Sequence, residues 1–327
     1  MSPRVYSESE LPVTLLAGCL GAGKTTLLNY ILSQNHGRRI AVVENEFGEI
    51  PVDHDLIIGA DDDIFEMSNG CVCCSIRSDL IETLGRLLKR QDRFDAIVIE
   101  ATGLASPGPI AQAFLLEEAL PQALKLDGVI TVVDCLHIHR QLEDLEVAWE
   151  QIAFSNVLLL NKADLAGAEE LQKVEARVRA INPTAALYRT RHGRLDLDKL
   201  LNLGGFEISE DLLHHEEDET QHHHHPDEGE NPVTSVSLEL EGKIDEGRFR
   251  QWLQMLLIME GMDVFRAKGV LHLPDSPLPC LFQSVFQMYD SQSGAGWKGG
   301  KPLNRLVFIG RGLDAGRLQA GVRSCMV

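Results

Sequence analysis

The residues best suited to chemistry form a run near the N-terminus that combines three glycines with a lysine and a threonine. The run reads Gly18-Cys19-Leu20-Gly21-Ala22-Gly23-Lys24-Thr25. Glycines at this spacing let backbone N–H groups close around phosphate oxygens, and a helix that begins there adds positive potential. The Lys24 ammonium can reach the outer phosphates of a nucleotide, and the Thr25 hydroxyl can bind Mg²⁺. The sequence therefore predicts a phosphate site made by Gly18, Gly21, Ala22, Gly23, Lys24, Thr25 and Thr26.

The segments on either side of this loop favour that interpretation over a glycine-rich turn without a ligand. Residues 13–17 form a short apolar run that is typical of a buried strand. Residues 26–32 repeat apolar side chains at helical spacing. A strand, this loop and a helix in succession are the context in which the motif indicates phosphate binding.

A second motif indicates which base the nucleotide carries. Asn161-Lys162-Ala163-Asp164 follows the apolar run 157–160, at the end of a strand where ligands bind in open α/β sheets. The Asp164 carboxylate can accept the ring N–H and the exocyclic amine of guanine. Adenine would leave that carboxylate unpaired, and sites built on hydrogen bonds reject such a partner strongly. We therefore expect Asn161, Lys162 and Asp164 to bind GTP rather than ATP.

A third element lies between these two motifs. Residues 96–99 form an apolar strand pattern that ends in Glu100 and continues as Ala101-Thr102-Gly103. Glu100 is suited to contact Mg²⁺, directly or through water, or to position the attacking water. The Gly103 N–H is suited to contact the γ-phosphate and to begin a segment that responds to it. Lys24 and Glu100 are the predicted catalytic residues.

Three of the seven cysteines lie within four residues, in Asn69-Gly70-Cys71-Val72-Cys73-Cys74. A turn followed by a helix places thiols near a helix N-terminus, which favours the thiolate that binds zinc, cobalt or nickel. The alternative is that all three are small buried core residues. We expect that role instead for the cysteines outside this triplet, which are Cys19, Cys135, Cys280 and Cys325.

Carboxylates that could complete a metal site follow the strand pattern of residues 40–43. The segment reads Glu44-Asn45-Glu46-Phe47-Gly48-Glu49. Glu44 and Glu49 are predicted to supply oxygen ligands beside Cys71, Cys73 and Cys74, whereas Glu46 is expected to be solvated.

The composition limits the classes of partner. The chain has 327 residues and a formal net charge of -19, which argues against nucleic acid or an anionic membrane surface as a partner. No apolar run is long enough for a transmembrane helix, and the first residues lack a signal-peptide core. We therefore expect a cytoplasmic protein, whose cysteines stay reduced.

One segment differs sharply from the rest. Residues 206–232 contain ten acidic residues, no lysine or arginine, and six of the twelve histidines. Such a segment buries little apolar surface and is predicted to be a linker. His222, His223, His224 and His225 offer imidazoles beside carboxylates, which suit an accessory zinc, nickel or cobalt site. A solvated linker that is merely rich in histidine is the alternative.

These patterns predict an α/β fold with two domains. Residues 1–205 alternate strands and helices, which predicts a P-loop GTPase domain with a mostly parallel, doubly wound sheet. Residues 185–189 are expected to be its last strand, with residues 190–193 near the guanine. Residues 233–327 predict a smaller α/β domain for client recognition or regulation, in which Trp297 is either a partner contact or a loop anchor.

The motifs occur in the order seen in the CobW-like metallochaperone GTPases, and the chain resembles that family. The resemblance rests on the loop 18–25, the segment 44–49, the triplet 71–74, the segment 100–103 and the motif 161–164. That family is related to the GTPases that help insert nickel into urease and hydrogenase, and within it the chain most resembles the bacterial members linked to zinc homeostasis.

The resemblance implies slow GTP hydrolysis, zinc or a similar metal at the Cys-x-Cys-Cys motif, and delivery of that metal to a client protein. A homo-oligomer that depends on nucleotide or metal is left open. The alternative function is a passive zinc buffer or sensor in which GTP is only a structural ligand.

Overall fold

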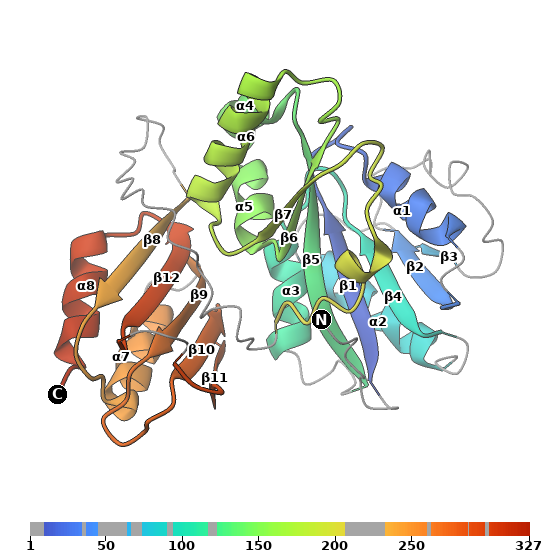
Figure 1. Cartoon of the computed structure of the whole chain (residues 1–327). Coiled ribbons are helices and arrows are strands. Elements are labelled where there is room, and N and C mark those ends of the chain that lie inside the picture. Colours follow the sequence, from blue (N-terminus) through green and yellow to red (C-terminus); the bar gives the residue numbers. More distant parts are fainter. Residues whose placement is uncertain are drawn as a thin grey trace. The chain divides into compact units, whose positions relative to one another are not determined.

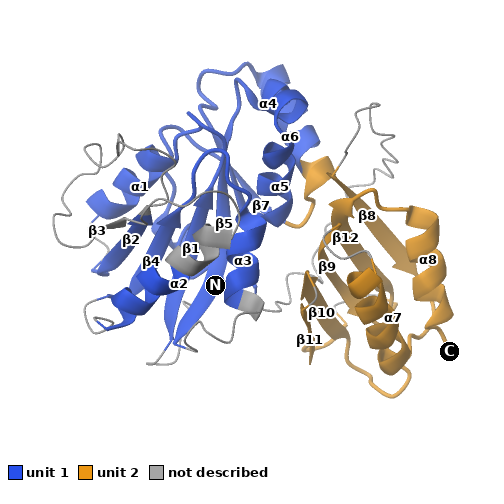
Figure 2. Cartoon of the chain, turned by 180° about the vertical axis from the view of Figure 1, so that it is seen from behind, with its two compact units in different colours: residues 1–178, 185–206 blue, residues 179–184, 207–327 orange. Residues whose placement is uncertain are grey.

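The chain is described by a computed structural model that covers residues 10–34, 37–44, 64–66, 74–89, 94–116, 123–206, 233–259, 263–286, 288–297 and 301–327. These residues belong to two compact units (Figure 2). The first unit takes in residues 1–178 and 185–206, and the second takes in residues 179–184 and 207–327.

The first unit is built on a seven-stranded sheet, in the order β3-β2-β4-β1-β5-β6-β7 (Figure 1). Every neighbouring pair in it is parallel. The strands are β1 (Leu11–Ala17), β2 (Ile40–Glu44), β3 (Ile64–Glu66), β4 (Ala96–Glu100), β5 (Leu124–Asp134), β6 (Val157–Asn161) and β7 (Ala186–Arg189). All seven residues of β1 are buried, as expected of a central parallel strand. The strand order reverses at β1, and ligands bind at such a point in open α/β sheets.

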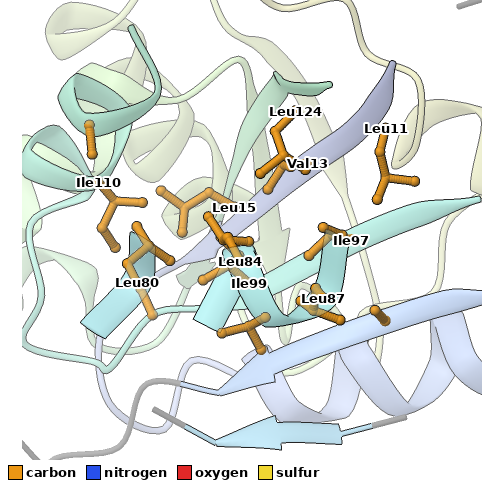
Figure 3. Packing of buried hydrophobic residues seen from close by; sticks show 14 of the residues in the cluster. Leu11, Val13, Leu15, Leu80, Leu84, Leu87, Ile97, Ile99, Ile110 and Leu124 are labelled. Carbon is orange, nitrogen blue, oxygen red and sulfur yellow. The ribbon is translucent and has the colours of Figure 1, made fainter. Parts of the chain in front are cut away.

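Helices cover both faces of this sheet, so the predicted doubly wound fold is confirmed. They are α1 (Lys24–Ser33), α2 (Cys74–Leu88), α3 (Pro107–Leu116), α4 (Ile138–Asp144), α5 (Glu146–Phe154) and α6 (Ala168–Ile181), with a 3₁₀ turn at Leu197–Lys199. One core cluster joins the leucines of α2 to β1 and β4 (Figure 3). A second cluster joins Leu27, Leu28 and Ile31 of α1 to Leu16 and to residues of β2, β4, β5 and β6.

The spacing of the apolar residues explains why α2 packs as it does. Leu80, Leu84 and Leu87 recur every three or four residues, which places them on one face of the helix. All three are buried and belong to one cluster with Leu15 and Ile99, and Figure 3 shows Leu84 beside these two residues. The helix that carries the predicted metal triplet at its start is therefore fixed to the same strands that precede the nucleotide loops.

The second unit has a five-stranded antiparallel sheet in the order β11-β10-β9-β12-β8. Its elements are β8 (Val233–Leu240), α7 (Glu246–Met259), β9 (Val264–Leu271), β10 (Cys280–Val285), β11 (Met288–Ser293), β12 (Asn304–Arg311) and α8 (Ala315–Ser324). Phe249, Leu253 and Leu257 of α7 pack in one core with Leu318 and Val322 of α8. This arrangement confirms the predicted smaller domain with helices and strands.

Two details of the second unit differ from, or decide between, the expectations. The sequence of residues 281–289 predicts a single strand, but this prediction is wrong. Here β10 and β11 form a hairpin that turns at Phe286, which has a φ of 50°. Trp297 packs against Val270 and Leu281, and its ring meets that of His272 edge-on. This packing favours the loop anchor over the partner contact.

None of the helices in the described part of the chain is both long and apolar enough to cross a bilayer.

Candidate nucleotide-binding site

The segments predicted to bind a nucleotide follow the carboxyl ends of β1, β4, β6 and β7. Because these strands are parallel, their carboxyl ends meet at one edge of the sheet. The phosphate loop follows β1, where the strand order reverses, and the guanine motif begins in the last residue of β6. The fold therefore brings together motifs that lie more than a hundred residues apart in the sequence.

The phosphate loop has a backbone that only glycine adopts easily. Gly18, Gly21 and Gly23 have φ values of 136°, 75° and 107°. A Cβ at Gly18 would lie 2.4 Å from the Val132 carbonyl oxygen, and one at Gly23 would lie 2.5 Å from Nδ2 of Asn161. The loop is therefore packed tightly against β5 and the end of β6, and any larger residue at these two positions would displace it.

Lys24 is the first residue of α1 and is only 8% exposed. Its Nζ donates a hydrogen bond to the Gly18 carbonyl oxygen at 3.1 Å, so the side chain lies back along the loop that precedes it. The ammonium and the first N–H groups of α1 together make this end of the helix positive, which suits a polyphosphate.

Thr25 and Glu100 meet across the loop, since the Thr25 hydroxyl donates to Oε1 of Glu100 at 3.0 Å. They come from the start of α1 and the end of β4. A hydroxyl and a carboxylate oxygen are ligands that Mg²⁺ accepts, usually together with phosphate oxygens and water. The pair therefore fits the predicted magnesium role on its chemistry.

Asn161 is 3% exposed and holds two loops together. Its Nδ2 donates to the Ala22 carbonyl oxygen at 2.9 Å, and its Oδ1 accepts from the backbone N–H of Gly193 at 3.0 Å. Thr190 adds a longer hydroxyl contact to the same oxygen at 3.4 Å. Asn161 thus joins the phosphate loop to the segment after β7, which was expected near the guanine.

Lys162 is fixed by a buried carboxylate. Its Nζ donates to the Gly21 carbonyl oxygen at 2.9 Å and to Oδ2 of Asp134 at 2.7 Å. Burial by itself would raise the pKa of Asp134, but hydrogen bonds from Lys162, His137 and the Leu136 N–H hold that pKa below its usual range. The Asp134 carboxylate is therefore ionised at neutral pH, and it orients Lys162 over the phosphate loop.

Asp164 lies at the predicted guanine position with a side chain that is 31% exposed. Its Oδ2 lies 3.2 Å from Nε of Arg191, which follows β7 and is 70% exposed. The carboxylate therefore faces Arg191 in the segment 190–193, which is predicted to lie near the guanine. An exposed pair of this kind contributes little free energy, so the guanidinium can move aside for a base.

Gly103 lies directly against the phosphate loop. A Cβ on it would be 2.5 Å from the Leu20 backbone nitrogen, so a side chain at this position would push the two loops apart. The preceding Thr102 carries a hydroxyl that is buried and has no hydrogen-bond partner among the described residues. The close approach of the two loops therefore requires glycine at position 103.

The predicted metal ligands fall largely outside the described residues. This applies to Cys71, Cys73, Glu49 and the histidines His222, His223, His224 and His225. Glu44 ends β2 and Cys74 begins α2, but only their backbones are described. Within the described residues, no group of three or more His, Cys, Asp or Glu side chains could hold a metal. The four remaining cysteines are free and buried, as expected.

Two residues at this edge were missed by the sequence analysis. Asp134 could have been found, because it ends an apolar strand at the edge where ligands bind. Gln151 gave a weaker signal in the sequence, because it is a polar residue among the apolar positions of α5 that are buried, such as Ala148 and Ile152.

Comparisons with known proteins agree with this architecture. Residues 12–189 match the family described as CobW/HypB/UreG, nucleotide-binding domain. Residues 233–326 match the cobalamin synthesis protein cobW C-terminal domain. The first match covers the seven-stranded sheet and its motifs, and the second covers the antiparallel sheet of the second unit.

Individual relatives extend over most of the chain. The zinc chaperone YjiA of Escherichia coli K12 is 38% identical over 95% of this chain and 97% of its own length. The zinc-regulated GTPase metalloprotein activator 1 of Schizosaccharomyces pombe is 41% identical over 60% of this chain and half of its own length. The crystal structure of Zn(II)-bound YjiA GTPase from E. coli matches with a TM-score of 0.76 and 32% identity, over 97% of this chain and 99% of that one.

Two family models match successive parts of the chain, and one relative aligns over nearly its whole length. These matches agree with the nucleotide site described above. The chain therefore belongs to the CobW/HypB/UreG family of nucleotide-binding proteins and carries the cobW C-terminal domain.

Proposed function

We propose that this chain is a cytosolic zinc metallochaperone in which GTP binding and hydrolysis control the delivery of zinc to a client protein. The chain is a GTPase of the CobW/HypB/UreG family. Relatives named as zinc chaperones support zinc as the metal that is carried. The relative named a zinc-regulated GTPase metalloprotein activator supports a client protein as the recipient.

The nucleotide half of the proposal rests on the contacts at the edge of the first sheet. Lys24 would neutralise phosphate charge, and Thr25 with Glu100 would hold Mg²⁺, which supplies further positive charge at the phosphates. Asp164 would accept hydrogen bonds from guanine. Lys24 is the one cation that the phosphate motif provides, so we propose slow hydrolysis by the isolated chain.

The observation that carries the coupling to zinc is the register of β2, β3 and β4. Glu44 at the end of β2 pairs with Glu100 on one side and with Glu66 on the other. Glu100 contacts Thr25 at the phosphate loop. The strands β2 and β3, which precede the predicted zinc ligands in the sequence, therefore end in register with β4 at the nucleotide edge of the sheet.

This placement suggests how the two sites communicate. A change in nucleotide that moves Glu100 acts on the strand ends from which both metal segments start. The α2 helix begins at Cys74, and its Leu80, Leu84 and Leu87 pack in the same core as β4, which supports a link between this helix and the nucleotide edge. We propose that Cys71, Cys73 and Cys74, with Glu44 and Glu49, form the zinc site that responds to the nucleotide.

A passive zinc buffer or sensor is the second candidate. Burial raises the pKa of Cys135 and Cys280 to about 11, so both remain thiols. Because zinc binds the thiolate, these buried cysteines favour neither function. The pairing of Glu44 with Glu100 favours the GTPase-coupled function, because it links the strand that precedes predicted zinc ligands to the nucleotide edge.

The two predicted metal sites are expected to differ in affinity. Changing Cys71, Cys73 and Cys74 together to serine should abolish tight zinc binding, because the thiolates provide soft ligands. Deleting residues 214–225 should lower the number of zinc ions bound and leave the tight site intact. Titration of the full chain with zinc against a competing chelator measures both quantities.

A matched control replaces the six histidines of residues 206–232 by asparagine, which keeps the length of the chain. It should behave like the deletion. The tight site should also weaken as pH falls, because its thiols must lose protons to bind zinc. Loss of the tight site in the histidine variants, with the cysteine variant unaffected, would reverse the roles of the two sites.

A further inference from the structure

Gln151 is a buried amide that contacts two separate segments of the nucleotide site. It lies on α5 and is only 1% exposed. Its Nε2 donates to the carbonyl oxygens of Gly103 at 3.3 Å and Ala105 at 3.1 Å. Its Oε1 accepts from the Cys19 thiol at a sulfur–oxygen distance of 3.5 Å. Both amide hydrogens and the amide oxygen are therefore used, and each contact goes to a loop at the nucleotide edge.

The base of this side chain is held firmly. The backbone carbonyl oxygen of Gln151 accepts hydrogen bonds from Thr131 on β5 and from Ser155, each at 2.7 Å. Both hydroxyls are buried. The amide group therefore projects from a fixed point of the core toward the loops, rather than adjusting its position to follow them.

The contact with Cys19 depends on the protonated thiol. Burial raises the pKa of Cys19 to about 11, with Asp134 adding to the effect and Lys24 opposing it. At neutral pH the thiol therefore keeps its hydrogen and donates it to Gln151. This residue of the phosphate loop acts as a hydrogen-bond donor and not as a reactive thiolate.

The contact with Gly103 matters because a glycine backbone is otherwise free to rotate. Gly103 is the residue whose N–H is predicted to reach the γ-phosphate, and it packs against the Leu20 backbone of the phosphate loop. Fixing its carbonyl oxygen limits the rotation of its backbone. Ala105, two residues later, is fixed by the same amide, so the segment is held at both ends.

We propose that Gln151 is a positioning residue that joins the phosphate loop to the Gly103–Ala105 segment and so sets the γ-phosphate side of the site. It is needed for hydrolysis and for distinguishing GTP from GDP, and it has no part in recognising guanine. This inference rests on the proposed GTPase function and assigns a role in it to a residue outside every nucleotide motif.

The test compares the full-length wild type with Gln151→Met, which keeps the length of the side chain and removes its hydrogen bonds. We expect kcat for GTP to fall by about 10–100-fold, as small displacements of reacting groups cause, with KM nearly unchanged. GDP affinity should stay close to that of the wild type. The ratio of affinities for a non-hydrolysable GTP analogue and GDP should shift by about fivefold or more.

Asn156 provides a matched control, because it is also an amide that joins two backbone segments. Its Oδ1 accepts from the Val129 N–H at 2.9 Å and its Nδ2 donates to the Gly205 carbonyl oxygen at 2.6 Å, away from the nucleotide motifs. Asn156→Leu should lower the melting temperature and leave kcat and the affinity ratio unchanged. Equal losses of kcat in the two variants would show a general structural effect and overturn the inference.

Cys19 gives a second test if Gln151→Met does not fold. Cys19→Ala removes the donor to Oε1 and should reduce kcat, whereas Cys19→Ser provides a new donor and should restore it. Equal rates in these two variants would contradict the inference. Hydrolysis by the wild type is tested separately, and its absence would overturn the proposed GTPase cycle. The ratio of affinities for the GTP analogue and GDP would still decide the role of Gln151.

Discussion

Changing Lys24 to alanine is expected to abolish measurable GTP hydrolysis by the full-length chain. Lys24 is 8% exposed, and its ammonium nitrogen lies 3.1 Å from the Gly18 carbonyl oxygen, inside the loop that would surround the phosphates. No other side chain of the phosphate motif carries a positive charge. Removing one preorganised group that stabilises charge in a transition state commonly costs on the order of 10²–10³ in rate, and we expect a loss of at least that size.

The comparison uses single-turnover hydrolysis with a control at Lys173. That lysine is 59% exposed and pairs with Glu169 one turn earlier on α6, so Lys173→Ala should leave the rate unchanged. A melting curve of each variant checks that it is folded. Hydrolysis by Lys24→Ala at the rate of the wild type would show that the phosphates bind elsewhere.

The second large effect concerns the base. The wild type should bind GTP far more tightly than ATP, and Asp164→Ala should remove most of that preference. A fully buried hydrogen-bonding site rejects a mismatched ligand by about 10⁴-fold or more. The Asp164 side chain is 31% exposed, so we expect a preference of roughly 100-fold or more. Competition of ATP and GTP for a fluorescent GDP analogue measures this preference.

Arg191 and Asp196 separate the possible causes of such a loss. Arg191→Ala removes the ion pair with Asp164 and leaves the carboxylate, so the preference for GTP should persist. Asp196→Ala removes an 81% exposed carboxylate that pairs only with nearby Lys199 among its described contacts, and should have no effect. Equal affinity of the wild type for ATP and GTP would contradict the assignment of the guanine motif.

Most strands of the first unit could be predicted from the sequence because their signals are local, whereas the three-residue β3 gave no such signal. The apolar runs of β1, β4 and β6 each end at a motif, and the leucines of α2 recur at helical spacing. The hairpin of β10 and β11 was missed because its turn uses Phe286, a large residue at a φ of 50°. Such a position normally favours glycine or asparagine, and no turn signal was therefore present.

The side-chain contacts at the site depend on residues distant in the chain, which local patterns do not reveal. The bond between Lys162 and Asp134 joins the ends of two neighbouring strands. The contacts of Gln151 join it to residues 132 and 48 positions away. The types and spacing of the residues predict which segments meet at the edge of the sheet. Only the folded chain shows which side chains hold the others in position by hydrogen bonds.

The coupling between nucleotide and metal is tested most directly by zinc affinity in the two nucleotide states. Zinc binding to the full-length chain is measured by chelator competition, once with GDP and once with a non-hydrolysable GTP analogue, each with Mg²⁺. Because Glu44 pairs with Glu100 beside the nucleotide site, we expect the two affinities to differ by about 5–150-fold, the usual range of coupling between sites. Zinc should change the ratio of GTP-analogue to GDP affinity by the same factor, and the triple cysteine-to-serine variant should lose this effect. Identical zinc affinities in the two states would contradict the account and leave a passive zinc buffer.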